Sequence, residues 1–392
     1  MDFNKTINRW HTGCVKYDGL QQNYGRSDLL PLWVADMDFE VCPAITEALR
    51  HRLEHQVFGY SIAPDSYWQS IQDWLLNRHR FSVERDELTF IPGIVRGLAM
   101  ALQVFTDKGD KVLIQQPVYH PFRIIIEGNC RKVVRNPLRF CDDGHVEMDF
   151  ELLERQFAEE RPRMMILCNP HNPAGRVWTC QELVQMGNIC LKHGVFVISD
   201  EIHCEFVMPG HTYTPFASIS EDFAMNCAVC LSPSKAFNIA GLQIANIIVK
   251  NEKVRKRVDK AININEVCDV NPFGVIALQA AYSAEGEEWL NQLCHYISDN
   301  YLMACQLFTE ALPQCPVTTL EGTYLMWVDI RATGKTSRQV TDHLLRKAKV
   351  YVNCGTMYGD SAGEGFIRIN LATRRSLLRE GIQRIIRGIS NN

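Results

Sequence analysis

Short apolar runs that end in polar or turn residues recur along the middle of the chain. Each run is continuous, without the strict alternation of a strand that has one face in water. This pattern is typical of strands buried on both faces of a sheet, and it predicts a largely parallel sheet. The runs are VLIQQP (112–117), MMILCNP (164–170), VFVISDE (195–201), CAVCLSPSK (227–235) and IANIIVK (244–250).

Helical patterns lie between these runs. Thr179 and Glu182 form a T-x-x-E capping box ahead of an amphipathic stretch, which predicts a helix start. Strands that alternate with helices predict an α/β fold. From about residue 286 the pattern changes, because a long helical run (287–312) precedes the strand-like segments LMWVDI (325–330) and FIRIN (366–370) and a helical C-terminus. This change predicts a second, smaller lobe.

The chain shows no internal repeat, low-complexity tract or Gly/Ser linker, so lobe boundaries are expected inside helices or short loops. We expect three parts. Residues 1–45 form an N-terminal segment that joins the small domain, residues 46–285 form a large domain with the candidate site, and residues 286–392 form the small C-terminal domain.

Composition excludes several classes of function. Of the 392 residues, 46% are hydrophobic and 22% are charged, as in soluble globular proteins. The net charge of -4 and the lack of a Lys/Arg block argue against nucleic acid or an anionic membrane as a partner. The N-terminus is polar, and no stretch approaches the ~18 apolar residues of a membrane span. Fifteen scattered cysteines argue against a disulfide framework, so we expect a cytoplasmic protein.

Two motifs suggest other chemistry, and both favour an ordinary structural interpretation. Cys227 and Cys230 form a C-x-x-C within an apolar strand, where positions three apart face opposite sides. His51, Glu54 and His55 spell the zinc pattern H-x-x-E-H on a predicted helix from residue 43 to about 56, without an evident third ligand. We interpret the first as a buried strand and the second as a packed or solvated helix.

Polar residues concentrate where the predicted strands end. Ligands of open α/β sheets bind beyond the carboxyl ends of the strands, so these residues are expected to share one crevice. They are Asn169 and Asn172, then Asp200 and His203, then Ser232, Ser234 and Lys235.

The segments NPHNPAGRVW (169–178), SDEIH (199–203) and SPSKAFNIAGLQ (232–243) resemble the signatures of fold-type I pyridoxal 5′-phosphate (PLP) enzymes of the aspartate aminotransferase superfamily. DLLPLWVADMDFE (28–40) and HQVFGY (55–60) make the chain similar to the MalY/PatB subgroup of carbon–sulfur lyases. The resemblance covers nearly the whole chain. It implies a large domain with a mostly parallel seven-stranded sheet flanked by helices, and a smaller α/β domain.

The resemblance implies roles for the crevice residues. Lys235 carries PLP as a Schiff base and later acts as the base at the substrate Cα. Asp200 pairs with the pyridinium nitrogen, and Asn172 hydrogen-bonds the phenolic oxygen. Tyr119 stacks on the ring and is a candidate proton donor to the leaving sulfur. His203 is also expected to bind the cofactor, because it stands where many aminotransferases have a tyrosine that hydrogen-bonds the phenolic oxygen.

Phosphate and carboxylate contacts are implied in the same way. Arg368 is the expected clamp for the substrate carboxylate, with Asn172 and Tyr119 also facing the substrate. Tyr60 matches a tyrosine that reaches the phosphate of the neighbouring subunit, which implies a homodimer with shared sites. The other expected phosphate contacts are the hydroxyls of Ser232 and Ser234 and the helix start at Gly93, Ile94 and Val95.

The expected reaction is α,β-elimination from cystathionine or a related L-cysteine S-conjugate, giving a thiol, pyruvate and ammonia without a metal. Gln243 supports a lyase, because aminotransferases usually carry a phosphate-binding arginine at this position and carbon–sulfur lyases commonly lack it. Two alternatives stay open: an aminotransferase, and a regulatory or interaction protein that retains PLP.

Overall fold

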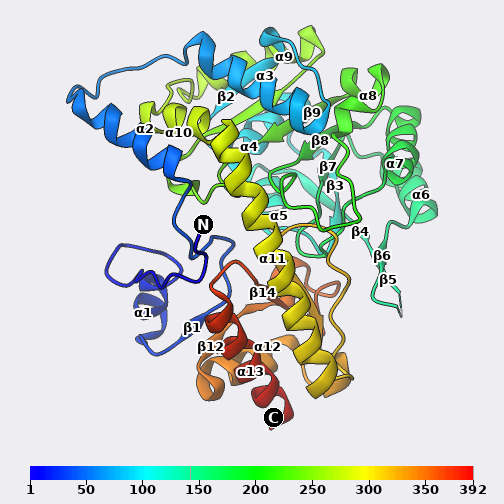
Figure 1. Ribbon diagram of the computed structural model, residues 1–392. Helices are drawn as coiled ribbons and strands as arrows, with labels where there is room; N and C mark the ends of the chain where they lie inside the picture. Colours follow the sequence, from blue (N-terminus) through cyan, green and yellow to red (C-terminus); the bar gives the residue numbers. More distant parts are fainter. Residues whose placement is uncertain (142, 392) are drawn as a thin grey trace.

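The computed structural model describes residues 1–141 and 143–391, and a seven-stranded sheet lies at its centre (Figure 1). Strand β10 runs antiparallel to both of its neighbours, and the other six strands share one direction. The mostly parallel sheet predicted from the sequence is thus confirmed. The strand order is β2 (Leu88–Ile91), β10 (Ala245–Ile248), β9 (Cys227–Leu231), β8 (Phe196–Asp200), β7 (Met164–Cys168), β3 (Lys111–Gln116) and β4 (Lys132–Pro137).

Helices cover both faces of this sheet, which explains why its central strands are continuously apolar. Successive residues of β3 pack into different hydrophobic cores, Leu113 into one and Ile114 into the other. Helices α4 (Ile94–Phe105), α5 (Pro121–Gly128) and α9 (Glu252–Ile264) contribute to the core that holds Ile114. Helices α6 (Phe150–Glu160) and α7 (Cys180–His193) contribute to the core that holds Leu113.

The start of α7 shows the predicted capping box. The Thr179 hydroxyl accepts a hydrogen bond from the Glu182 amide (3.2 Å), and the Glu182 carboxylate accepts one from the Thr179 amide (2.8 Å). Two amide donors at the first turn are therefore satisfied. The helix ends at Gly194, whose φ of 63° is a left-handed conformation that glycine adopts at low cost.

A second lobe follows the large sheet. The 28-residue helix α11 (Ala284–Ala311) runs from the large lobe down the side of the small one (Figure 1). An antiparallel sheet in the order β11 (Leu325–Asp329), β14 (Phe366–Asn370) and β13 (Asn353–Cys354) forms the small lobe with α12 (Ser337–His343) and α13 (Arg375–Ser390).

The N-terminal segment packs on this small lobe. Its strand β1 (Leu30–Pro31) pairs in parallel with β12 (Val350–Tyr351), and its first helix is α1 (Asp18–Tyr24). The boundaries at residues 45 and 285 remain predictions. The remaining helices of the large lobe are α2 (Pro43–Glu54), α3 (Asp65–His79), α8 (Glu221–Met225) and α10 (Pro272–Ala281).

The two competing motifs have the expected structural surroundings. Cys227 and Cys230 are buried, free thiols of β9. His51 lies exposed on α2, where its Nδ1 is 3.1 Å from Glu54, and His55 is exposed just beyond the helix. Within the described residues, no helix combines the length and apolarity needed to cross a bilayer.

Candidate active site

Three neighbouring strands of the large sheet end level with one another. Cys168 of β7 is the register partner of Asp200 of β8, which is in turn the partner of Cys230 of β9. The loops that follow carry Asn172, His203 and Lys235, so the structure brings the predicted crevice residues to one edge of the sheet.

Lys235 meets the N-terminal segment at this edge. Its amine donates a hydrogen bond of 2.6 Å to the carbonyl oxygen of Ala35. Burial, together with the positive charge of Arg368, lowers the pKa of Lys235 to about 8, although the nearby Asp36 and Asp200 act in the opposite direction. The amine therefore loses its proton more readily than that of an ordinary lysine, and the unprotonated form is the one that attacks an aldehyde.

Asp200 is buried at the end of β8. One of its oxygens accepts a hydrogen bond from the Ile202 amide at 3.2 Å. Burial raises the pKa of Asp200 to about 7, and the neighbouring Glu201 contributes to this increase. A carboxyl group with this pKa gains strongly from a cationic partner, which is the role expected of the PLP ring nitrogen.

Arg368 is a buried guanidinium on β14, and it forms no ion pair with an acid among the described residues. Its Nη1 donates to Oδ1 of Asn172 at 3.0 Å, and its Nη2 donates to the Trp33 carbonyl at 2.8 Å. Its Nε has no hydrogen-bond partner in the described part of the chain. A buried cation of this kind favours an anionic ligand such as an amino-acid carboxylate.

His203 and Tyr119 complete the polar surroundings. Burial and the charges of Lys235 and Arg368 hold the pKa of His203 well below its ordinary value, so the imidazole is neutral. Its buried Nδ1 has no partner among the described residues. The Tyr119 amide donates to the Asn172 carbonyl at 3.0 Å, and burial raises the pKa of the Tyr119 hydroxyl to about 12. The set fits PLP: an amine for the aldehyde, an acid for the ring nitrogen, and neutral donors.

The expected phosphate side is formed by the start of α4 and the loop before Lys235. Gly93 has a φ of 114°, a conformation that favours glycine, and Ile94 and Val95 begin the helix. The Ser232 hydroxyl donates to the Ile244 carbonyl at 2.6 Å and accepts from the Ser234 amide at 3.1 Å. Ser232 thus stabilises its own loop, and its predicted phosphate contact remains a prediction, as does that of Ser234.

The sequence interpretation missed Arg96, in the first turn of α4. Its Nη1 donates to Oε1 of Gln243 at 3.0 Å, and no ion pair of Arg96 occurs in the part of the chain that the structure describes. A positive charge therefore lies beside the position where the sequence lacks one. The signal was present as a basic residue three positions after Gly93, but only the fold brings it next to Gln243.

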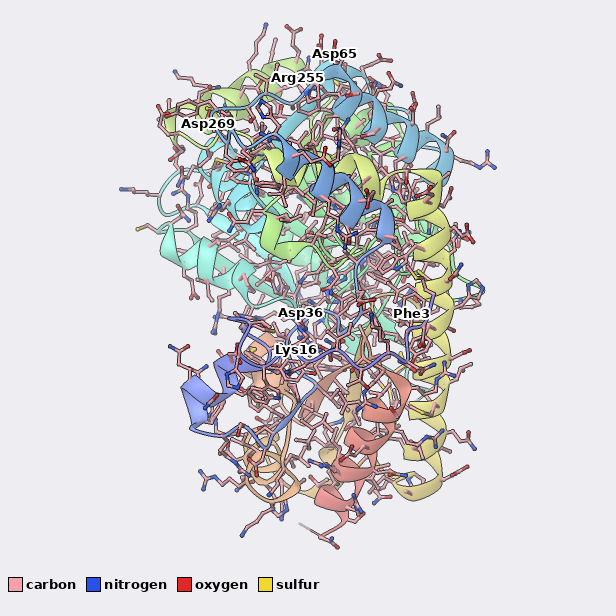
Figure 2. All side chains as sticks on the ribbon, turned by 60° about the vertical axis from the view of Figure 1, so that its left-hand side comes forward. Phe3, Lys16, Asp36, Asp65, Arg255 and Asp269 are labelled. Carbon is pink, nitrogen blue, oxygen red and sulfur yellow. The ribbon has the colours of Figure 1, made fainter. Side chains whose placement is uncertain are left out.

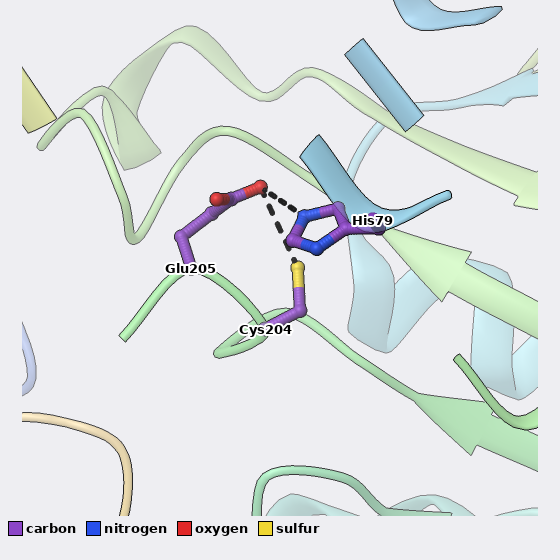
Figure 3. Close-up of side chains that lie close together, drawn as sticks. All are labelled: His79, Cys204 and Glu205. Atoms are coloured by element: carbon purple, nitrogen blue, oxygen red, sulfur yellow. Dashed lines mark hydrogen bonds and ion pairs between the residues drawn. The ribbon is translucent and has the colours of Figure 1, made fainter. Parts of the chain in front are cut away.

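A second group of titratable residues is formed by His79, at the end of α3, with Cys204 and Glu205, in the loop after β8 (Figure 3). The Glu205 carboxylate already accepts hydrogen bonds from Trp74, Arg78 and His79. Despite burial, the charges of His79 and Arg78 hold the pKa of Glu205 at about 2. Burial and the Glu205 charge raise the pKa of the Cys204 thiol well above its ordinary value. The arrangement is a buried ion-pair network and does not suit a metal ion.

Comparison with known proteins gives the family. The sequence model of the protein family "Aminotransferase class I and II" matches residues 27–385. The chain belongs to the aminotransferase class I and II family. It is 42% identical to "Cystathionine beta-lyase PatB" of Bacillus subtilis (strain 168) over 390 residues, which cover 100% of both chains. It is 33% identical to "Protein MalY" of Escherichia coli (strain K12), covering 99% of this chain and 98% of that one.

The solved structures agree. The PLP-bound C-S lyase from Staphylococcus hominis superimposes with a TM-score of 0.92 at 34% identity, covering 99% of this chain and 98% of the other. The resemblance to the MalY/PatB subgroup and the fold-type I architecture are both confirmed by these comparisons.

Proposed function

We propose that this protein is a PLP-dependent carbon–sulfur β-lyase that converts cystathionine or a related L-cysteine S-conjugate into a thiol, pyruvate and ammonia. One observation supports this function above the others. A part-buried amine whose pKa is lowered (Lys235) and a buried guanidinium without an acid partner (Arg368) lie at the same edge of the large sheet, next to a buried acid (Asp200). This set suits an amino acid whose carboxylate and amino group must be held while Cα is deprotonated.

Each residue of the crevice has a definite task in this proposal. PLP, when bound, supplies the electron sink that accepts the charge from Cα. Arg368 holds the substrate carboxylate in a bidentate fork, with Asn172 fixing the guanidinium. Lys235 takes the Cα proton. Tyr119, which keeps its own proton at neutral pH, is the candidate donor of that proton to the departing sulfur.

The test is an assay of the purified protein with cystathionine, cysteine and S-alkyl cysteines, in which pyruvate and thiol are measured without any 2-oxo acid. Release of both products is expected, and Lys235→Ala should abolish it together with the visible absorbance of the bound cofactor. Pyruvate release retained in Lys235→Ala would exclude the assignment of this lysine.

An aminotransferase is the second candidate function, because the chain belongs to the aminotransferase class I and II family. The products distinguish the two. Turnover that requires a 2-oxo acid acceptor and releases no thiol would identify the aminotransferase.

A homodimer with shared sites belongs to the same proposal. Tyr60 is 98% exposed in the single chain. Its neighbours Val57, Phe58 and Ile62 are also exposed apolar residues, so the loop between α2 and α3 presents a surface that fits a second copy of the chain. Equilibrium sedimentation should give twice the chain mass, and Tyr60→Phe should weaken PLP binding without changing that mass.

A cytoplasmic location belongs to the proposal as well. All fifteen cysteines are free thiols, which supports a protein of the reducing cytoplasm.

A further inference from the structure

Residues 33–39 form a strap that lies between the two lobes, in contact with Lys235 and Arg368. Side chains of both lobes bind its backbone carbonyl groups. From the small lobe, Arg368 binds the carbonyl of Trp33, and Asn370 binds those of Val34 and Asp36. From the large lobe, Lys235 binds the carbonyl of Ala35, and Asn238 binds those of Met37 and Phe39.

The strap also carries two acids that face two bases of the N-terminal segment. Arg9 forms a bidentate pair with Asp36, with distances of 2.8 and 3.1 Å, and its Nη1 also lies 2.8 Å from Asp38. The amine of the fully buried Lys16 lies 2.9 Å from Asp38 and 3.7 Å from Asp36. Figure 2 shows Asp36 and Lys16 beside each other between the lobes. The four charges cancel, which limits the cost of burying them.

These bonds fix the position of one atom in particular, the carbonyl oxygen of Ala35. It accepts the Lys235 amine at 2.6 Å and the Tyr324 hydroxyl at 3.1 Å. The next residue is Asp36, which is held through its carboxylate by Arg9 and through its own carbonyl by Asn370. A shift of Asp36 would therefore displace the acceptor of the lysine amine.

We propose that the Asp36–Arg9 ion pair is a positioning device for Lys235, fixing the Ala35 carbonyl and setting the balance of charge beside the amine. The proposal rests on the proposed role of Lys235 as the PLP-binding lysine. Asp36 is the negative member of the pair and favours the protonated amine, while Arg9 offsets this effect. The other titratable or charged groups that face the crevice around Lys235 are Asp200, His203, Arg368, Tyr119 and Tyr324.

A pair that only tied the segment down would give a different response to mutation. Loss of either member would then loosen the strap in the same way. A pair that also balances charge responds with opposite signs, because Arg9→Met leaves the cluster of Arg9, Lys16, Asp36 and Asp38 with an excess of negative charge, whereas Asp36→Asn leaves it with an excess of positive charge.

The experiment is a pH titration of the visible absorbance of the PLP-loaded protein, which reports protonation of the nitrogen that links Lys235 to the cofactor. Arg9→Met should raise the midpoint and Asp36→Asn should lower it, each by on the order of 0.5 pH unit. The double variant should return close to the wild-type midpoint, and Arg9→Lys should stay near it. Lys5→Met, which breaks the exposed Lys5–Glu40 pair, is the matched control and should change nothing.

Shifts of the same sign, or no shift, in Arg9→Met and Asp36→Asn would overturn the proposal. If Arg9→Met does not fold, Asp36→Asn is nearly isosteric and decides the question by itself, since an unchanged midpoint rejects the charge role. Borohydride reduction and peptide mapping of the wild-type protein separate this failure from that of the proposed function. PLP attached elsewhere than at Lys235 rejects the proposed function, whereas attachment at Lys235 without the opposite shifts rejects only the positioning role.

Discussion

Arg368 donates a hydrogen bond of 3.0 Å from Nη1 to Oδ1 of Asn172, across 196 positions of sequence. This bond joins the candidate carboxylate clamp on the small lobe to the loop after β7 on the large lobe. The other terminal nitrogen of Arg368, Nη2, donates to the Trp33 carbonyl, so the plane of the guanidinium is fixed before any substrate enters. Preorganisation of this kind reduces the ordering cost of binding a carboxylate.

Arg368→Lys should reduce kcat/KM by roughly 10- to 100-fold, because an ammonium group keeps the charge but loses the fork and the bond to Asn172. Most of the loss is expected in KM. Steady-state kinetics on the substrate found in the lyase assay separate the effect on KM from the effect on kcat. Arg384→Lys on α13 provides a control far from the candidate site. An unchanged KM would show that the substrate carboxylate binds elsewhere.

Asp200→Asn should stabilise the cofactor-free protein but weaken the binding of PLP. The folded-state pKa of Asp200 is raised from 3.8 to about 7, so its ionisation disfavours the folded state as pH rises through this range. The free energy of unfolding of the cofactor-free variant should therefore exceed that of the wild type above pH 7, by up to roughly 4 kcal/mol. Below pH 4 this difference should vanish.

The same substitution should weaken PLP binding, because a neutral amide cannot hold the proton on the ring nitrogen. Urea unfolding of the cofactor-free proteins at several pH values measures the first effect, and absorbance titration with PLP measures the second. If the difference in free energy of unfolding between the two proteins did not change with pH, the raised pKa of Asp200 would be contradicted.

Arg96→Met should weaken binding of PLP by roughly 10- to 150-fold, because a hydrogen bond to a charged group contributes about 1.5–3 kcal/mol. It should leave binding of pyridoxal, which lacks the phosphate, unchanged. Gln243→Arg in the Arg96→Met background should restore PLP affinity. Equal losses for PLP and pyridoxal would place Arg96 outside the phosphate site.

Glu205→Gln should destabilise the protein by roughly 3 kcal/mol at pH 7, because it leaves His79 without its acid and Arg78 with Glu287 alone. The folded-state pKa of Glu205 is lowered from 4.5 to about 2, so its contribution is complete above pH 4.5 and is lost as pH falls toward 2. Urea unfolding measures the difference. Glu154→Gln, which removes an exposed acid paired with Lys192, should cost far less.

Much of the large sheet was predictable from the sequence, because strands covered on both faces are continuously apolar. Two strands were not singled out. Strand β4 (Lys132–Pro137) lies at the edge of the sheet and exposes alternate residues, so its pattern is more polar, and β2 (Leu88–Ile91) has only four residues. The reversed direction of β10 was not predicted either, because apolar burial does not encode strand direction.

The crevice was predictable to the extent that it consists of side chains at strand ends. Lys235, Asp200 and Asn172 converge because parallel neighbours end at one edge. The contacts of the strap were not predictable, since Trp33 and Ala35 act through carbonyl oxygens that every residue possesses. Which of these oxygens meets a side chain depends on the path of the folded chain.

The distance in sequence between the parts of this site limits when it can form. Ala35 and Lys235 are 200 residues apart, and Trp33 and Arg368 are 335 residues apart. A nascent chain lacks the strand that carries Arg368 until more than 300 residues after Trp33 have been synthesised. The candidate site is therefore completed only after both segments have been made, and a product that stops before Arg368 would retain much of the large sheet without a finished site.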